Sequence, residues 1–407
     1  MEIFDSDSDD LAMLSLWLNK KRERQWVNIV NKKRKTHGQF ETLVREDLEV
    51  DPDKFFNFFR MTQVQFEILF DLIKDDISKT DTNFRKSITP RERLAICLRF
   101  LASGDSYTSL HYNFRVGIST ISAIVLEVAD AIWKKLQPVY MAPPTKDEWA
   151  DISADFERRW NFPNCVGAID GKHVTIKAPG NSGSLFYNYK GTYSIVLMAL
   201  VDANYNFICV DVGNYGSSSD GGIFSRMQLK IALEENTLGI PPPKVLPDMP
   251  ELGPVPHVIV GDEAFPLKTN VMRPYPGKKL DREKRIYNYR HSRARRISEN
   301  VFGILANKFR IFHRKLELKP ANVDKVVLCA TVLHNFIRKT GPTPMGSDDP
   351  DISSIESVEG LLSLEHSGFH SSKDAIDVRE KLCKWFSSDV GIVSWQDRLC
   401  FGHAAAN

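Results

Sequence analysis

The spacing of apolar residues divides the chain into a helical part and a part that combines strands with helices. Over residues 52–137, apolar positions recur every three or four residues, which predicts amphipathic helices. Further along, short continuous apolar runs are bounded by glycine or turn residues, which predicts buried strands. The predicted strands are 165–170, 193–201, 207–212 and 257–260, and the accompanying helices are 223–235, 288–309, 322–338 and 375–386. This order predicts a mixed α/β fold, with a sheet that carries helices on its face.

The helical part contains a candidate helix-turn-helix. A helix over 90–104 is followed by a short helix over 106–114, a turn at Gly117 and a further helix, an order compatible with that motif. Ser119 and Thr120 lie at the exposed start of the last helix, where they would contact DNA. The pattern is equally typical of helices that only pack together, and the last helix lacks the cations that usually read bases.

Length, composition and turn signals indicate the domain organisation. The 407 residues give room for about two or three domains, and the 42% of apolar residues can build a proper core. Prolines over 138–144 mark a domain boundary. We predict a flexible N-terminal segment with basic clusters (1–50), a helical, helix-turn-helix-like domain (51–145), an α/β catalytic domain (146–339), and an acidic linker with a C-terminal helix (340–407).

The composition argues against several classes of protein. The six cysteines form no CxxC pair, so a cysteine zinc site is not expected. Those in apolar runs resemble the buried free thiols of a reducing compartment. No apolar run approaches the roughly 20 residues of a membrane span, and the acidic N-terminus does not fit a secretory signal. We therefore expect no membrane partner.

Charge is distributed unevenly, although the net charge is only +2. Two basic clusters stand near the N-terminus, and they consist of Lys20, Lys21, Arg22, Lys32, Lys33, Arg34 and Lys35. Their spacing resembles a two-part nuclear import signal, although a solvated helix face would look the same. We predict a nuclear protein and leave a cytoplasmic share open. Basic segments beside an acidic pocket also suit a polyanionic substrate.

Four acidic residues stand where a divalent-metal site could be built. Asp170 and Asp262 end predicted strands, Asp220 lies in a Gly/Ser-rich loop, and Glu299 lies on a predicted helix. Carboxylates at strand ends are typical of ligand sites in α/β folds, and Mg²⁺ and Mn²⁺ prefer such oxygen ligands. Two such ions roughly 4 Å apart can clamp both oxygens of a phosphodiester displacement. We predict that these four residues bind metal, with Asp220 the one most open to a simple turn role.

The helix that carries Glu299 also carries candidate DNA contacts. Glu299 lies about 200° round the helix from Ile297 and off the apolar stripe, so it is not a core residue. Taken alone, an exposed pair with Arg295 explains it more simply. The run just before it interleaves aromatic residues with cations, which suits phosphates and unpaired bases. The candidate DNA-binding cations are Arg290, Arg293, Arg295 and Arg296.

Five motifs, in order over about residues 160–338, resemble the PIF/Harbinger transposases and the nucleases derived from them. They are Ala168-Ile-Asp-Gly-Lys-His173, Gly216-Ser-Ser-Ser-Asp-Gly-Gly-Ile-Phe224, Gly261-Asp-Glu-Ala-Phe-Pro-Leu267, Arg295-Arg-Ile-Ser-Glu-Asn-Val-Phe-Gly-Ile-Leu305 and Leu333-His-Asn-Phe-Ile337. The resemblance implies an RNase H-like catalytic domain with the acidic triad of cut-and-paste transposases.

Matched by motif, the resemblance makes Asp170, Asp262 and Glu299 catalytic, and it makes Asp220 either a fourth metal ligand or the middle acid. It further implies DNA as substrate, through terminal repeats and an AT-rich target, together with a Myb/SANT-like DNA-binding partner and a homodimer. We predict a metal-dependent DNA endonuclease or transposase that uses Mg²⁺ or Mn²⁺. The alternative is a domesticated DNA- or chromatin-binding protein without cleavage activity.

Overall fold

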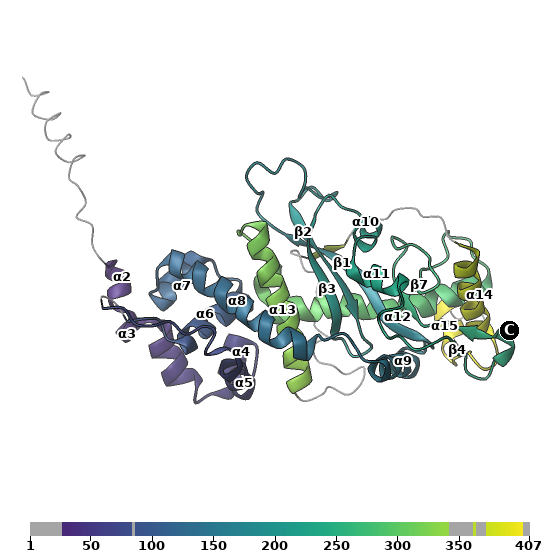
Figure 1. Cartoon of the computed structure of the whole chain (residues 1–407), viewed down its shortest axis with the longest axis horizontal. Coiled ribbons are helices and arrows are strands. Elements are labelled where there is room, and N and C mark those ends of the chain that lie inside the picture. The colour runs from purple at the N-terminus through teal and green to yellow at the C-terminus, as the bar shows by residue number, and fades with distance from the viewer. Residues whose placement is uncertain (1–26, 84–85, 342–360, 364–371, 402–407) are drawn as a thin grey trace, which may run out of the picture.

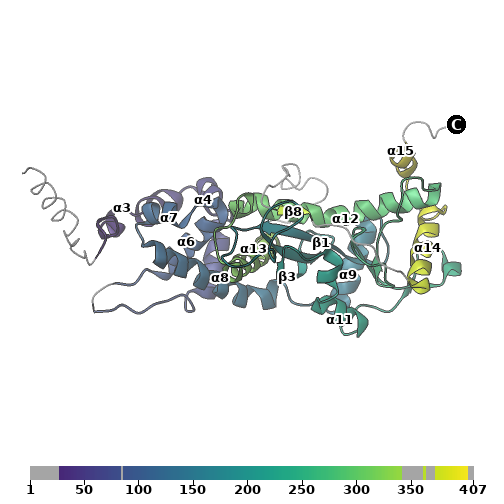
Figure 2. The ribbon, with the colours of Figure 1, turned by 90° about the horizontal axis from the view of Figure 1, so that it is seen from above.

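The computed structural model describes residues 27–83, 86–341, 361–363 and 372–401. A helical part lies at one end, a sheet lies in the middle, and C-terminal helices lie at the other end (Figure 1). The view from above shows the same lengthwise order (Figure 2). The predicted mixed α/β fold with a preceding helical region is confirmed.

The helical part begins earlier than the sequence predicted. Its elements are α2 (Ile29–Lys32), α3 (Arg34–His37), the π-helix η1 (Phe40–Leu48), α4 (Pro52–Phe59), α5 (Gln63–Ile73), α6 (Pro90–Ser103), α7 (Tyr107–Phe114) and α8 (Ile118–Tyr140). Phe40, Val44 and Leu48 of η1 are buried in the common core. Because this apolar side packs, the prediction of a flexible segment over 1–50 is wrong for residues 27–50.

Helices α7 and α8 form the candidate helix-turn-helix. They meet at a bend of 104°, within the range of about 90–120° typical of that motif. Helix α8 continues through Pro138 and ends at Tyr140, before the predicted domain boundary between residues 145 and 146. Leu136 is fully buried there, and its packing outweighs the one backbone hydrogen bond that a proline removes.

No single helix among the described residues is long and apolar enough to span a membrane, and only the bent pair α7–α8, taken together, has the length and composition for it.

The main sheet has the strand order β3-β2-β1-β6-β7, and β8 also pairs with β1. Its strands are β1 (Cys165–Thr175), β2 (Ser194–Val201), β3 (Phe207–Tyr215), β6 (Val258–Val260), β7 (Val271–Met272) and β8 (Leu361–Ser363), while β4 (Lys244–Val245) and β5 (Pro254–Val255) form a separate pair. The first three strands are antiparallel, whereas β6 runs parallel to β1 and β7 runs parallel to β6. This order is that of the RNase H-like fold.

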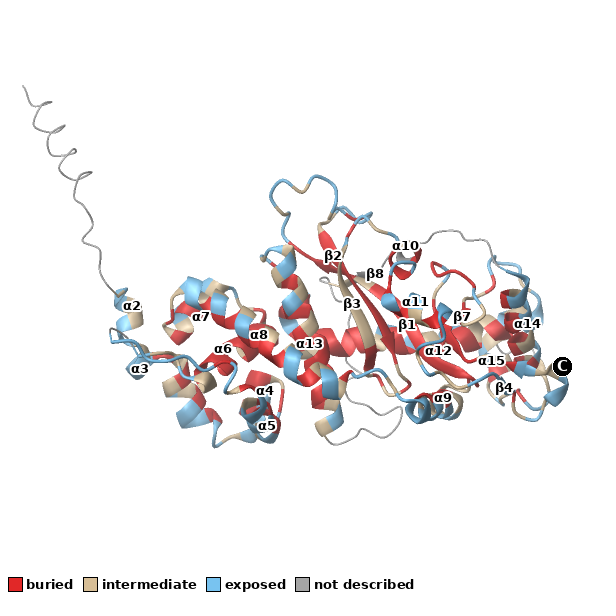
Figure 3. Cartoon of the chain, viewed as in Figure 1, coloured by how far each residue is buried: buried red, intermediate tan, exposed pale blue. Residues whose placement is uncertain are grey.

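Both faces of the sheet are covered, which explains why β1 and β2 read as continuous apolar runs. The covering helices are α9 (Lys146–Trp160), α10 (Asp220–Phe224), α11 (Gln228–Glu234), α12 (Arg282–Lys308) and α13 (Pro320–Thr340). Successive residues of β2 alternate between two cores, with Leu197 and Ala199 in one and Met198 and Leu200 in the other. The first core lies under α12 and α13, and the second contains Trp149 of α9 and the apolar residues of α10 and α11. Figure 3 shows the buried residues gathered at the sheet.

The described C-terminal residues pack against the body of the α/β domain. Helix α14 (Lys373–Ser387) packs against α12, and α15 (Gln396–Phe401) also contacts it. The backbone of β8 pairs with Lys172–Val174 of β1. Phe386 is fully buried, and Nε1 of Trp385 donates a hydrogen bond to the Pro247 carbonyl oxygen at 2.9 Å. The core of the α/β domain is therefore completed by elements that lie beyond the predicted domain end at residue 339.

Candidate active site

Asp170 lies on β1, the central strand of the sheet. It stands opposite Ala199 of β2, which belongs to the core under α12, so the Asp170 side chain faces that helix. Asp170 is 4% exposed, and its Oδ1 accepts a hydrogen bond from the Gly171 N–H at 2.9 Å. Its Oδ2 is buried and accepts no hydrogen bond of good geometry. The strand therefore presents one carboxylate oxygen toward α12.

Asp262 follows β6, the parallel neighbour of β1. Ala168 pairs with Val260, and Asp170 and Asp262 each come two residues after these paired positions. Since neighbouring strands lie about 4.8 Å apart, the register brings the two carboxylates to the same edge of the sheet. Oδ1 of Asp262 accepts a hydrogen bond from the Ala264 N–H at 2.9 Å, which fixes the turn after the strand.

Glu299 projects from α12, the helix that packs against β1. Its Oε1 lies 2.8 Å from Nη1 of Arg295, one turn earlier, so the simple pair that the sequence allowed is present. Burial lowers the pKa of Arg295, but the charges of Glu299, Asp170 and Asp262 outweigh it and hold the pKa above its ordinary value. The guanidinium of Arg295 thus lies within electrostatic range of all three predicted catalytic acids, and it pairs directly with Glu299 alone among them.

Lys172 is a site residue that sequence reasoning missed. It lies two residues after Asp170 and thus on the same face of β1, with its Nζ 3.0 Å from Oδ2 of Asp170. The same Nζ lies 5.7 Å from the ring centroid of Phe302 on α12. Burial lowers the pKa of Lys172, while the charges of Asp170 and Glu299 raise it by more. Alternation along the strand was the signal that could have found this residue.

The ligand chemistry of the site fits a hard divalent cation. Carboxylates come from a strand, from the turn after a strand and from a helix, and hard cations prefer oxygen ligands of this kind. In the described parts of the chain, no three His, Cys, Asp or Glu side chains converge closely enough to hold a metal ion. The cations of Lys172 and Arg295 lie among the acids instead. They supply the positive charge that a bound metal ion would supply.

Some of the predicted metal-binding and nuclear-import residues have side chains that the structure does not describe. This applies to Asp220, whose backbone begins α10, and to Lys20, Lys21 and Arg22. Of the second basic cluster, Lys32, Lys33 and Lys35 are exposed. Arg34 instead pairs with the buried Glu92, with 3.0 Å between Nη1 and Oε2, so it holds the N-terminal helices on α6.

Arg290 is fully buried. Its guanidinium donates hydrogen bonds to the Asn161 carbonyl oxygen at 3.2 Å through Nε and to Oε1 of Gln396 at 2.9 Å through Nη1. The same Nη1 donates to the Gly391 carbonyl oxygen. The assignment of Arg290 as a DNA contact is therefore wrong, because its donors are used inside the fold.

The other candidate DNA contacts differ in exposure. Arg293 is half-buried, and its guanidinium carbon lies 4.7 Å from the ring centroid of Trp395. Arg296 is exposed on α12, and Ser119 and Thr120 are exposed at the start of α8. These three residues remain accessible to a polyanion.

Comparison with known proteins shows which family the α/β domain resembles. Residues 169–335 match the family described as DDE superfamily endonuclease, a stretch that contains Asp170, Asp262 and Glu299. No solved structure gives a significant match to the chain.

Named relatives narrow the resemblance further. An Arabidopsis thaliana protein named ALP1-like is 27% identical over 70% of this chain and 71% of its own length. The Arabidopsis protein named antagonist of like heterochromatin protein 1 is 26% identical over 70% of this chain and 73% of its own length. The mouse protein named "Putative nuclease HARBI1" is 24% identical over 72% of this chain and 81% of its own length. The predicted resemblance to Harbinger transposase-derived proteins is confirmed.

Proposed function

We propose that the chain is a divalent-metal-dependent DNA endonuclease or transposase of the Harbinger type. The observation that carries the proposal is the parallel register of β1 and β6, which brings Asp170 and Asp262 to one edge of the sheet beside the helix that carries Glu299. The three carboxylates come from the central strand, the turn after its parallel neighbour and the helix packed across them. The family match over 169–335 supports the same class of reaction.

The roles of the residues follow from their surroundings. Asp170 is held rigidly on β1, and it would position a metal ion together with Asp262 beside it and Glu299 opposite. Bound Mg²⁺ or Mn²⁺ would activate the attacking water or 3′-hydroxyl and neutralise the leaving oxygen. Lys172 and Arg295 would pair with phosphate oxygens once they leave the carboxylates. Asp220 remains in the proposal as a further ligand or as the middle acid.

The proposed substrate is nuclear DNA that carries an element's terminal repeats, with an AT-rich target. The exposed Arg296 and the exposed start of α8 support a polyanionic substrate. Helix α8 carries few base-reading cations, so the proposal includes a Myb/SANT-like partner that reads the sequence, and a homodimer that joins two DNA ends.

The test is cleavage of such a DNA with Mg²⁺ or Mn²⁺, with and without nuclear extract as a source of the partner. We compare the native chain with Asp170→Asn, Asp220→Asn, Asp262→Asn and Glu299→Gln, and we use Glu263→Gln as a matched control beside Asp262. Metal-dependent nicking that survives in the control and disappears in Asp170→Asn and Glu299→Gln supports the proposal. Whichever of the two remaining variants loses activity identifies the middle acid. Nicking that persists in Asp170→Asn would overturn the proposed nuclease function.

The second candidate is a domesticated DNA- or chromatin-binding protein without cleavage. The ion pair between Lys172 and Asp170 favours it, because an ammonium group holds the oxygen that a metal ion needs. The name of the relative antagonist of like heterochromatin protein 1 makes a chromatin role worth testing. A folded native chain that binds DNA but never cuts it under any of these conditions would select this candidate.

A further inference from the structure

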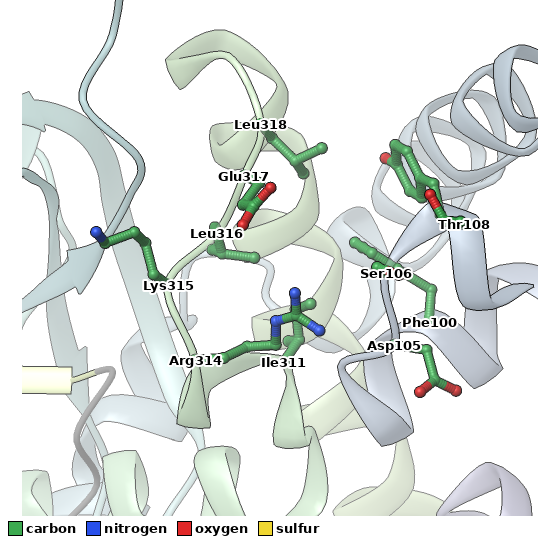
Figure 4. Close-up of a pocket in the computed structure, with 11 residues that line it drawn as sticks. Phe100, Asp105, Ser106, Thr108, Ile311, Arg314, Lys315, Leu316, Glu317 and Leu318 are labelled. Carbon is green, nitrogen blue, oxygen red and sulfur yellow. The ribbon is translucent and has the colours of Figure 1, made fainter.

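A group of cations gathers where the helical part meets the catalytic domain. The meeting elements are the end of α6 and the segment 309–318, which includes the 3₁₀ helix η3 (Arg310–His313). Figure 4 shows Arg314, Ile311 and Leu316 of this segment facing Phe100 and Asp105 across a pocket of about 160 Å³. A second hollow of about 680 Å³ adjoins it and is lined by Gly104, Arg310, Arg314 and their neighbours.

Close backbone approach builds this junction. Gly104 ends α6 with a φ of +70°, and a Cβ there would lie 3.0 Å from the Arg310 carbonyl oxygen. Only glycine combines that conformation with that contact. Arg314 donates a hydrogen bond through Nη1 to the Gly104 carbonyl oxygen. The positions of Arg310 and Arg314 are therefore set by the docking of the two parts.

Positive charge at this junction exceeds negative charge. The cations are Arg60, Arg99, Arg310, Arg314 and Lys315, and the nearby carboxylates are Asp105 and Glu317. Arg99 lies 3.8 Å from Asp105, whereas Arg60 and Arg310 have no carboxylate partner among the described residues. Nε of Arg60 is buried without a hydrogen bond. Burial and the like charges of Arg310 and Arg99 lower the pKa of Arg60 from its ordinary value.

The junction is physically joined to the candidate active site. Leu316 donates its N–H to the Thr175 carbonyl oxygen at 3.0 Å, at the end of the strand that carries Asp170. From Glu299 to the end of α12 at Lys308 is roughly 14 Å along the helix at 1.5 Å per residue, and Arg310 follows two residues later. That length is about half of the roughly 34 Å turn of a DNA duplex. A backbone that passes the acids can therefore reach this group of cations.

We propose that Arg60, Arg310 and Arg314 form a docking site for DNA backbone phosphates that flank the bond to be cut. The proposal rests on the proposed action on DNA and adds to it a named site at the junction. Guanidinium groups that form no ion pair with a carboxylate suit phosphate oxygens, and contacts to phosphates set the register of a protein on DNA without reading its sequence.

The experiment measures the binding of a fluorescent DNA duplex by anisotropy at several salt concentrations, without divalent metal. The variants are Arg60→Gln and Arg310→Gln, and Arg398→Gln on α15 is the matched control because it removes an exposed arginine far along the chain. Each junction variant should reduce the slope of log affinity against log salt by about one, while the control keeps the native slope. Melting curves verify that each variant is folded. If Arg60→Gln does not fold, Arg310→Gln alone tests the proposal, because Arg310 is exposed.

Native slopes in both junction variants would overturn the proposal, as would a native chain that binds no duplex. Titration with inorganic phosphate alone separates a free anion from DNA. Stabilisation by phosphate that Arg310→Gln abolishes, with DNA binding unchanged, would assign the site to a free anion and contradict the proposal. Because metal is absent, these outcomes are distinct from failure of the cleavage assay, which judges the nuclease function itself.

Discussion

Nζ of Lys172 lies 3.0 Å from Oδ2 of Asp170, and both side chains are nearly buried on the same face of β1. A second ion pair of this kind lies on α12, the helix packed on the sheet, where Arg295 pairs with Glu299. Asp170 and Glu299 therefore each have a cation partner. The charges of these two carboxylates are balanced without a metal ion, so metal binding there would exchange one cation for another.

Lys172→Gln tests this exchange. A buried carboxylate that loses its partner typically destabilises a protein by about 3 kcal/mol or more, so the metal-free variant should melt at a lower temperature than the native chain. A ligand that binds only the folded state stabilises it by mass action. Added Mn²⁺ should therefore raise the melting temperature of Lys172→Gln by more than that of the native chain. Equal metal-induced shifts in the two proteins would show that Lys172 does not compete with the metal.

Arg290 and Arg296 should separate stability from DNA binding. Arg290→Met leaves the Asn161 and Gly391 carbonyl oxygens without their donor, and we expect a loss of about 3 kcal/mol in the free energy of unfolding. Arg296 is exposed, so Arg296→Gln should change stability by less than about 0.5 kcal/mol and weaken DNA binding. Urea unfolding and anisotropy measure the two effects. An Arg290→Met variant with native stability and reduced DNA affinity would contradict the structural role given to Arg290.

Asp324 should make stability depend on pH. It lies near the start of α13 against Gly213, and burial raises the pKa of Asp324 to about 6. The folded state thus binds this proton more tightly than the unfolded chain, and the resulting stability is complete below about pH 4 and is lost as the pH rises through about 6. The stability of Asp324→Asn, measured relative to the native chain, should therefore be higher at about pH 7 than at about pH 4. Melting temperatures at the two values test this, and a constant difference would argue against it.

The sequence predicted those features that depend on local pattern. Strands buried on both faces leave continuous apolar runs, so the strands that became β1, β2, β3 and β6 could be predicted. The motif resemblance named Asp170, Asp262 and Glu299, which lie on β1, in the turn after β6 and on α12. Helix α9 was missed although Thr145 and Glu148 form a capping box at its start, a signal that could have found it. The single helix predicted over 223–235 is broken into α10 and α11.

Features that depend on distant contacts could not be predicted. The first turns of α12 are polar and carry no apolar period, so the sequence predicted a start at 288 rather than at Arg282. Arg282 pairs there with Asp397 at 2.8 Å, and Arg285 donates a hydrogen bond to the Cys400 carbonyl oxygen. The burial of Arg290 likewise depends on Gln396. In each case the partner lies about a hundred residues further along the chain, where no local pattern reveals it.

The most direct test of the central claim replaces Mg²⁺ by Fe²⁺ and maps where the bound ion cuts the polypeptide. Hydroxyl radicals generated at the ion cleave the chain close to its ligands, and mass spectrometry identifies the fragments. A site shared by Asp170, Asp262 and Glu299 predicts cuts near all three residues, which excess Mg²⁺ suppresses and Asp170→Asn abolishes. Cuts that avoid these three positions, or that Mg²⁺ leaves unchanged, would contradict the proposed metal site.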